Sequence, residues 1–129
     1  MAQIKIYGER RHLTTHRQVL SDAIHEVNRE VLGLPESKRF HRFIALDAED
    51  FVHADDRSAA YTIIEISLFE GRDATTKRRL LERLMAAIAE KVGMSVQDIE
   101  ITLFETPKAN WGIRGKVADE LTLDYKVDV

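Results

Sequence analysis

Residues 63–73 of the chain read IIEISLFEGRD, an alternating apolar pattern that runs into a turn. Apolar residues stand at every second position from Ile64 to Leu68, which predicts a strand with one buried face. A Glu-Gly-Arg turn follows, and Asp73 is a suitable N-cap for a helix that begins directly after it. A strand that leads through a short turn into a helix is the first part of a β-α-β unit.

The same arrangement occurs twice, at an offset of about 60 residues. Ile4-Lys5-Ile6 recurs as Ile64-Glu65-Ile66, and each is an alternating strand. A helix opens in each half with residues 14–17 and 75–78. Thr15 and Gln18 stand in capping-box relation, which predicts the start of the first helix there. The chain is therefore predicted to contain two similar halves.

Each predicted helix carries an apolar stripe and stops at a glycine, Gly33 or Gly93. Strands are predicted after these stops, over residues 43–46 and 99–104. The stripe residues are Val19, Leu20, Ala23, Ile24, Val27 and Val31 in the first helix, and Leu80, Leu81, Leu84, Met85, Ile88 and Val92 in the second.

We therefore expect an α+β fold with two fused β-α-β units. Strands joined by a crossover helix pair in parallel, so the sheet should have four mainly parallel strands and two helices on one face. The whole chain, residues 1–129, is expected to be a single domain. Within it, residues 1–52 form the first unit, residues 61–115 form the second, and residues 116–129 remain as a tail.

The tail has a strand pattern of its own, because apolar residues alternate with polar ones from Leu121 to Val129. The sheet face opposite the helices also needs cover, since parallel sheets are normally buried on both sides. We expect the tail to add a strand to a neighbouring subunit, and we expect the protein to be a homotrimer.

Composition excludes several classes of function. A formal net charge of −3, from 19 basic and 22 acidic residues, argues against non-specific binding to nucleic acid or to a membrane surface. The chain has no cysteine, so disulfides and thiolate chemistry are excluded. No apolar run is long enough to span a bilayer. These features are compatible with a cytoplasmic location.

The second half also carries a set of motifs spread over its length. They are residues 68–73, Lys77, the pair Glu105-Thr106 and the stretch Asn110-Trp111-Gly112-Ile113-Arg114-Gly115. This set resembles the tautomerase superfamily and matches a whole 4-oxalocrotonate tautomerase subunit. Over its full length the chain is similar to the malonate semialdehyde decarboxylase-like group, in which two units are fused and subunits form trimers.

The resemblance implies a set of substrate-binding residues. Arg72 matches the arginine that holds the substrate carboxylate, and Trp111 matches the aromatic residue of the pocket wall. A second substrate arginine falls on Glu100 in this half, but the equivalent place in the first half holds Arg42. Arg114 lies in the same hairpin as Trp111 and completes the expected set.

The family's catalytic N-terminal proline corresponds here to Ala2. The Ala2 amine would act as a base or nucleophile only if Met1 is removed, because otherwise its nitrogen is an amide. Two further departures concern the decarboxylase group, whose aspartate falls on Lys38 and one of whose arginines falls on Glu70. The chain is therefore not expected to be a faithful malonate semialdehyde decarboxylase.

Two functions follow from this pattern. The first is a tautomerase-like protein that binds a small oxo or enol carboxylic acid and has weak or absent activity because Ala2 replaces the proline. If active, it would be a cofactor-independent isomerase or a related lyase. The alternative is a non-enzymatic trimeric protein that binds small anions or serves as a scaffold. His12 and His16 have helical ligand spacing but no acidic partner, so no metal site is expected.

Overall fold

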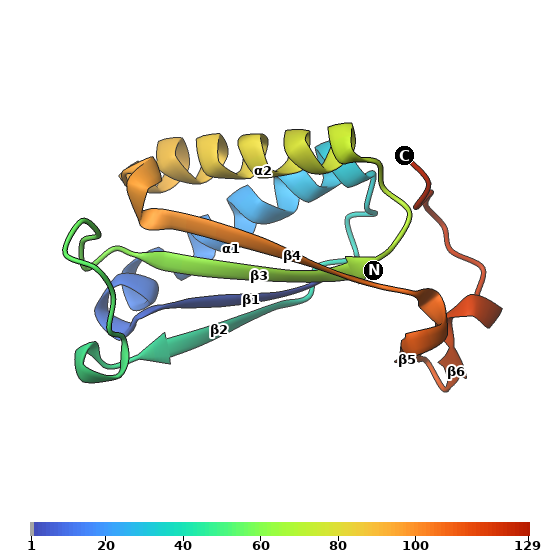
Figure 1. Ribbon diagram of the computed structural model, residues 1–129, viewed down its shortest axis with the longest axis horizontal. Helices are drawn as coiled ribbons and strands as arrows, with labels where there is room; N and C mark the ends of the chain where they lie inside the picture. The colour runs from blue at the N-terminus through green and yellow to red at the C-terminus, as the bar shows by residue number, and fades with distance from the viewer. Residues whose placement is uncertain (1) are drawn as a thin grey trace.

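The computed structural model describes residues 2–129 (Figure 1). A small hairpin of β5 (Gly112–Ile113) and β6 (Lys116–Val117) follows the main elements. Those main elements are β1 (Ala2–Glu9), α1 (Arg10–Leu32), β2 (His41–Leu46), β3 (Thr62–Phe69), α2 (Ala74–Ile88) and β4 (Ile99–Thr106).

The four long strands form one mixed sheet in the order β2-β1-β3-β4. Each β-α-β unit contributes a parallel pair, β1 with β2 and β3 with β4. The two units meet through an antiparallel pairing of β1 and β3, which places Ala2 opposite Leu68 and Gly8 opposite Thr62. The predicted fold of two fused β-α-β units with a mainly parallel sheet is confirmed.

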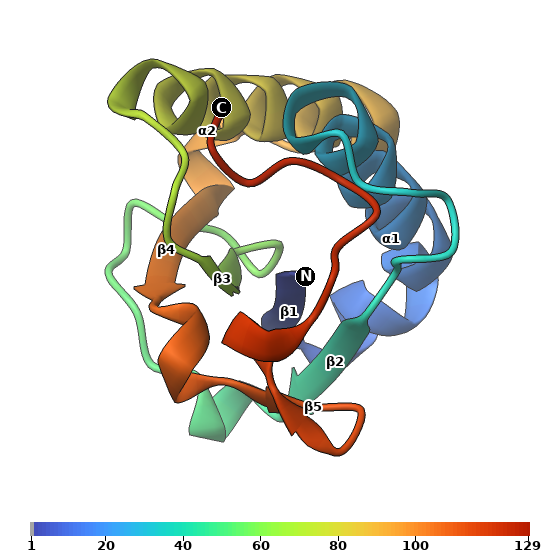
Figure 2. The ribbon, with the colours of Figure 1, turned by 90° about the vertical axis from the view of Figure 1, so that its right-hand side faces the viewer.

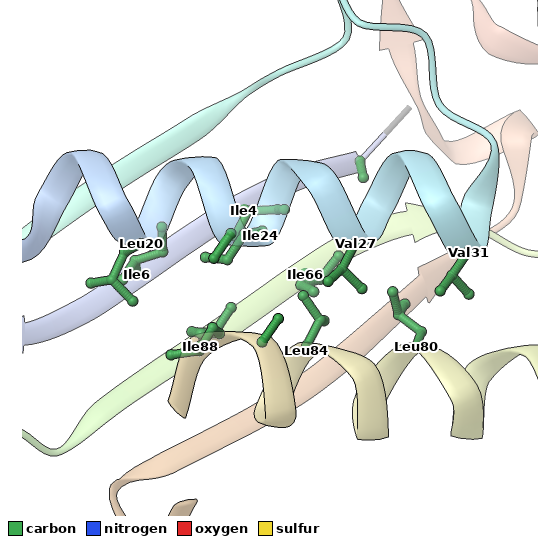
Figure 3. Close-up of a cluster of buried hydrophobic side chains, with 14 of the residues drawn as sticks. Ile4, Ile6, Leu20, Ile24, Val27, Val31, Ile66, Leu80, Leu84 and Ile88 are labelled. Atoms are coloured by element: carbon green, nitrogen blue, oxygen red, sulfur yellow. The ribbon is translucent and has the colours of Figure 1, made fainter. Parts of the chain in front are cut away.

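Both helices cover one face of this sheet, and the core lies between them and the strands (Figures 1 and 3). Every second residue of the central strands points into this layer, as the alternation in the sequence predicted. Figure 3 shows the side chains that meet there, among them Ile4, Ile6 and Ile66 from the sheet, Leu20, Ile24, Val27 and Val31 from α1, and Leu80, Leu84 and Ile88 from α2.

The two helices start differently. Asp73 caps α2 as predicted, because its Oδ1 accepts a hydrogen bond from the Thr76 amide at 2.8 Å. The prediction for α1 was wrong: this helix begins at Arg10, directly after β1, and not near Thr15. The hydroxyl of Thr15 instead donates to the carbonyl oxygen of Arg11 at 3.1 Å, within the helix.

The predicted end of α1 is confirmed. Gly33 adopts φ +68°, the left-handed region that favours glycine, and its amide donates to the Arg29 carbonyl oxygen at 3.1 Å. In the second unit α2 gives way after Ile88 to a π-helical turn, Ala89–Gly93, so the helical segment as a whole still ends at the predicted glycine.

The buried face of α1 is partly polar. Ser21, His25 and Asn28 are all buried. The Ser21 Oγ lies 2.8 Å from the Nδ1 of His41 at the start of β2, and the His25 Nε2 lies 2.9 Å from the carbonyl oxygen of Glu36. These contacts attach the loop between α1 and β2 to the helix.

The tail differs from its sequence pattern. Residues 121–129 form no strand in the described chain, although their apolar residues alternate. The tail instead turns back across the end of the sheet (Figure 2), where Val127 packs in one cluster with Phe69 and Ala118 of the same subunit. Val127 is thus buried against its own subunit without any pairing of the tail with a strand among residues 2–129. Its pairing with a neighbouring subunit stays a prediction.

Candidate functional site

The candidate site lies at the end of the sheet where β1 begins and β3 ends (Figure 2). The antiparallel register brings Ala2 to this end, opposite Leu68. The turn after β3 places Arg72 just before α2, and Trp111 arrives from the segment after β4 and packs against the end of β3. Segments far apart in the sequence therefore meet here.

Arg72 is the most unusual residue of this end, because only 4% of its surface is exposed. Its Nη1 donates a hydrogen bond to the Phe69 carbonyl oxygen at 3.2 Å. Its Nε and Nη2 are buried without a hydrogen-bond partner among residues 2–129. An unsatisfied buried donor costs about 1–3 kcal/mol, and more when it is charged. The guanidinium is therefore suited to an anion that accepts hydrogen bonds from both nitrogens.

The electrostatic surroundings of Arg72 are mixed. Burial lowers the pKa of Arg72 from its ordinary value, while the carboxylates of Glu105 and Asp128 oppose this shift. Glu105 already accepts a hydrogen bond from the Lys77 Nζ at 2.8 Å. An arginine remains protonated in proteins. The site thus keeps a positive charge beside two carboxylates, of which Glu105 is already paired with Lys77.

An apolar wall stands beside Arg72. Phe69 is fully buried, and its ring centroid lies 4.8 Å from that of Trp111 in an edge-to-face arrangement. The Trp111 carbonyl oxygen accepts a hydrogen bond from the Ala118 amide at 2.8 Å, which fixes the backbone at the tryptophan. Phe69 also supplies the carbonyl that binds Arg72, so one residue joins the wall to the guanidinium.

Ala2 lies at the same end but is packed into the core. It is 3% exposed and belongs to the large apolar cluster beneath the helices. The expectation that its amine is free depends on the removal of Met1, a residue outside those that the structure describes. The position of Ala2 at the start of a central strand fits the terminal strand that the sequence predicted.

The two other predicted arginines differ from Arg72 in being exposed. Arg42 is exposed on β2, in register with Lys5, on the sheet face that points away from the helices. Arg114 is exposed in the turn of the β5–β6 hairpin, where it adopts φ +54°. The structure therefore links Arg72 to Trp111 through Phe69 and places Ala2 opposite Leu68, whereas Arg42 and Arg114 are exposed on the surface of the subunit.

Sequence reasoning missed several neighbours of the arginine. Phe69 and Glu105 stand in the motifs quoted above, but alternation and spacing say nothing of which side chains approach Arg72. Val127 and Asp128 were assigned to an intersubunit strand, because period-two alternation does not reveal what a strand-like segment packs against. Both tail residues lie against Gly71, the residue that precedes Arg72.

The described residues contain neither a metal-binding cluster nor a membrane-spanning helix. Within residues 2–129, no three histidine, cysteine or acidic side chains gather in a way that would hold a metal ion. Over the same range, no helix has the length and apolar character needed to cross a bilayer.

Comparison with known proteins now decides the family. A family model described as tautomerase enzyme matches residues 38–114, more than half of the chain. The chain belongs to the tautomerase superfamily. Curated relatives agree: the 2-hydroxymuconate tautomerases of Pseudomonas putida and Comamonas testosteroni are each 35% identical over 57 residues, which cover 44% of this chain and 90% of the relative.

Solved structures resemble this superfamily member over nearly its whole length. A malonate semialdehyde decarboxylase inhibited by 3-bromopropiolate is 27% identical, with a TM-score of 0.81 over 94% of this chain and 98% of the other. A fused 4-OT described as an asymmetric trimer has a TM-score of 0.80 and 19% identity, covering 91% and 96% of the two chains. The second likeness concerns the fold alone.

Proposed function

We propose that this protein binds a small oxo or enol carboxylic acid at the end of the sheet formed by β1 and β3. The observation that carries the proposal is the buried guanidinium of Arg72, whose Nε and Nη2 have no acceptor among the described residues. A carboxylate presents two acceptor oxygens in the geometry of this fork. Trp111 and Phe69 would supply the apolar wall against the rest of the ligand.

In this proposal the Ala2 amine moves the proton once Met1 has been removed. A terminal amine has an ordinary pKa of about 7.7–8.0, which suits a base near neutral pH. Proton transfer next to a carbonyl requires no cofactor. Alanine gives a primary amine on a freer backbone than the proline of the family, so the keto-enol tautomerase activity is expected to be weak or absent.

The proposal includes a homotrimer. Tyr7 and Ile63 are only half-buried on the sheet face that points away from the helices, which indicates that a further partner covers it. The trimer described for a fused 4-OT supports this assembly. In such a trimer the exposed Arg42 and Arg114 would be available to a ligand bound at a neighbouring subunit. Light scattering should give about three times the chain mass of 14.8 kDa. The proposal also places the protein in the cytoplasm.

The carboxylate site is tested by calorimetric titration of pyruvate into the wild type and into Arg72→Ala. Loss of a charge-assisted contact should weaken binding by about 1.5–3 kcal/mol. The matched control is Arg11→Ala, because Arg11 is exposed near the start of α1 and follows the same Glu-x-Arg pattern as Arg72. Equal affinities of wild type and Arg72→Ala would show that Arg72 does not bind the carboxylate.

A second experiment separates the enzyme from the non-enzymatic anion binder or scaffold. Ala2→Pro should raise tautomerase activity on a 2-hydroxydienoate or phenylenolpyruvate at least about tenfold, since general base catalysis contributes ~10²–10⁴-fold. The assay follows enol decay by ultraviolet absorbance, with intact mass spectrometry to verify the loss of Met1. Ala2→Ser is the control, because it keeps a primary amine. If processed Ala2→Pro shows no gain, the non-enzymatic alternative leads.

A further inference from the structure

The C-terminal tail ends beside the start of α2 (Figure 2), and Arg72 lies in the turn that precedes this helix. Two contacts attach it there. The amide of Asp73 donates a hydrogen bond to the carbonyl oxygen of Val129 at 2.8 Å. Val127, which is 6% exposed, packs in the apolar cluster of Phe69. One polar and one apolar contact therefore hold the last residues against the turn that carries the arginine.

Gly71 is shaped to receive the tail. It has φ +139°, a conformation that other residues rarely adopt. A Cβ at this position would lie 2.7 Å from the Val127 Cγ1 and 2.9 Å from the Asp128 Oδ1, closer than real Cβ contacts allow. Both the backbone conformation and the missing side chain of Gly71 thus permit the close approach of the tail.

The tail touches both neighbours of Arg72, namely Gly71 and Asp73, and the arginine between them is almost completely withdrawn from solvent. In this arrangement the guanidinium has two unsatisfied nitrogens. A cover that seals an unsatisfied charged donor is a costly state of the site. Access of an anionic acceptor to these nitrogens would relieve that cost.

We propose that residues 121–129 form a strap over Arg72, and that the strap must lift before a carboxylate can reach the guanidinium. The ligand class rests on the function proposed above, whereas the strap itself rests on the contacts of the tail. A protein whose open state is the minor one binds with an apparent affinity reduced by the open fraction. Weakening the strap should therefore tighten binding of the anion.

Chemical labelling tests the strap without any ligand. Phenylglyoxal modifies accessible arginines, and peptide mapping by mass spectrometry resolves each one. Arg72 should react slowly in the wild type and about tenfold faster in Val127→Ser, which removes the apolar anchor. Val52→Ser is the matched control, since Val52 is 90% exposed, and it should leave the rate unchanged. Arg11, exposed in every variant, is the internal reference.

A second variant keeps the test decisive if Val127→Ser does not fold. A chain that ends at Lys126 lacks the contacts of Val127 and Val129 with the turn but keeps Leu123 and Tyr125, which pack against the apolar clusters. Its circular dichroism is compared with that of the wild type. Faster labelling of Arg72 in whichever variant remains folded supports the strap. Equal labelling of Arg72 in the wild type and in the folded variants overturns it, because the tail would then not restrict access.

Titration with pyruvate separates the strap from the proposed function. The variant with the weakened strap should bind pyruvate about fivefold more tightly than the wild type, as the open fraction increases. If Arg72 is labelled faster but no protein binds pyruvate, the carboxylate site is wrong and the strap stands. If pyruvate binds equally well to all variants, ligand entry does not require the strap to lift and the inference is overturned.

Discussion

The two helices occupy equivalent places in their β-α-β units, yet they are attached to the protein in different ways. The buried residues of α2 are all apolar, and Asp73 caps its first turn. The buried face of α1 includes Ser21, His25 and Asn28, and its N-cap Glu9 makes no side-chain hydrogen bond to the first turn of the helix. In the second unit the helix is thus held mainly by apolar packing, whereas in the first unit a polar network also holds it.

The two buried faces differ because each helix positions a different part of the protein. The polar residues of α1 hold the loop that leads to β2, through the contacts of Ser21 and His25 with His41 and Glu36. The start of α2 instead borders Arg72, and there a rigid cap and an apolar face keep the turn in place. The candidate site therefore borders the helix whose buried residues are all apolar.

The largest expected effect is on the apolar face of α2. Leu84→Ala should lower the free energy of unfolding by about 2–5 kcal/mol, because it leaves a cavity at a fully buried position. Urea denaturation measures this loss. Leu81→Ala is the control, since Leu81 is only half-buried on the same helix, and it should cost clearly less. Equal losses would contradict the apolar packing assigned to α2.

A smaller, pH-dependent effect is expected on the polar side of α1. Burial lowers the pKa of His41 from 6.5 to about 4, and the neighbouring Arg39 adds to the shift. The unfolded chain therefore takes up a proton at His41 before the folded chain does. Stability from the neutral imidazole is complete above about pH 6.5 and is lost as the pH falls towards about 4.

The test compares urea denaturation at pH 7 and at pH 4.5. After a discount for partial exposure, His41 should contribute about 2 kcal/mol to the wild-type loss, at 1.36 kcal/mol for each pKa unit. His41→Asn should lose correspondingly less on acidification, and His53→Gln in the linker should behave like the wild type. If the free energy of unfolding of His41→Asn falls with pH as much as that of the wild type, protonation of His41 does not cause the loss of stability in acid.

The smallest effect sharpens the contrast between the two caps. Asp73→Ala removes the acceptor of the Thr76 amide and should cost about 1 kcal/mol. Glu9→Ala changes the N-cap of α1, which contributes no side-chain bond to the helix start, and should cost no more than a few tenths of a kcal/mol. Thermal denaturation followed by circular dichroism compares the two variants. A larger loss of stability in Glu9→Ala than in Asp73→Ala would show that α1, not α2, has the stronger N-terminal cap.

Much of the fold could be predicted from the sequence because its signals are local. Alternation at Ile4 and Ile64, the cap at Asp73 and the stop at Gly33 all act within a few residues. The start of α1 was misplaced because a capping-box pattern at Thr15 also occurs inside a helix, where the hydroxyl bonds to the preceding turn.

The site was predicted less completely, because its properties depend on distant contacts. The resemblance drew attention to Arg72 and Trp111, and the structure brings both to one end through Phe69. The return of the tail to Gly71, next to Arg72, could not be foreseen, because it is a contact between residues more than fifty positions apart in the sequence. Arg42 was identified by its equivalent place in the first half and Arg114 by the hairpin that it shares with Trp111. Both are exposed on the subunit, unlike Arg72, and their role stays a prediction.

The antiparallel pairing of β1 with β3 has a practical consequence for handling the protein. It brings both described ends of the chain to the same end of the molecule, while the linker between β2 and β3 lies at the opposite end (Figures 1 and 2). An affinity tag or fluorescent fusion at either terminus would therefore crowd the arginine. An epitope or dye inserted in the linker, for example next to Val52, which is 90% exposed, would leave that end of the protein clear.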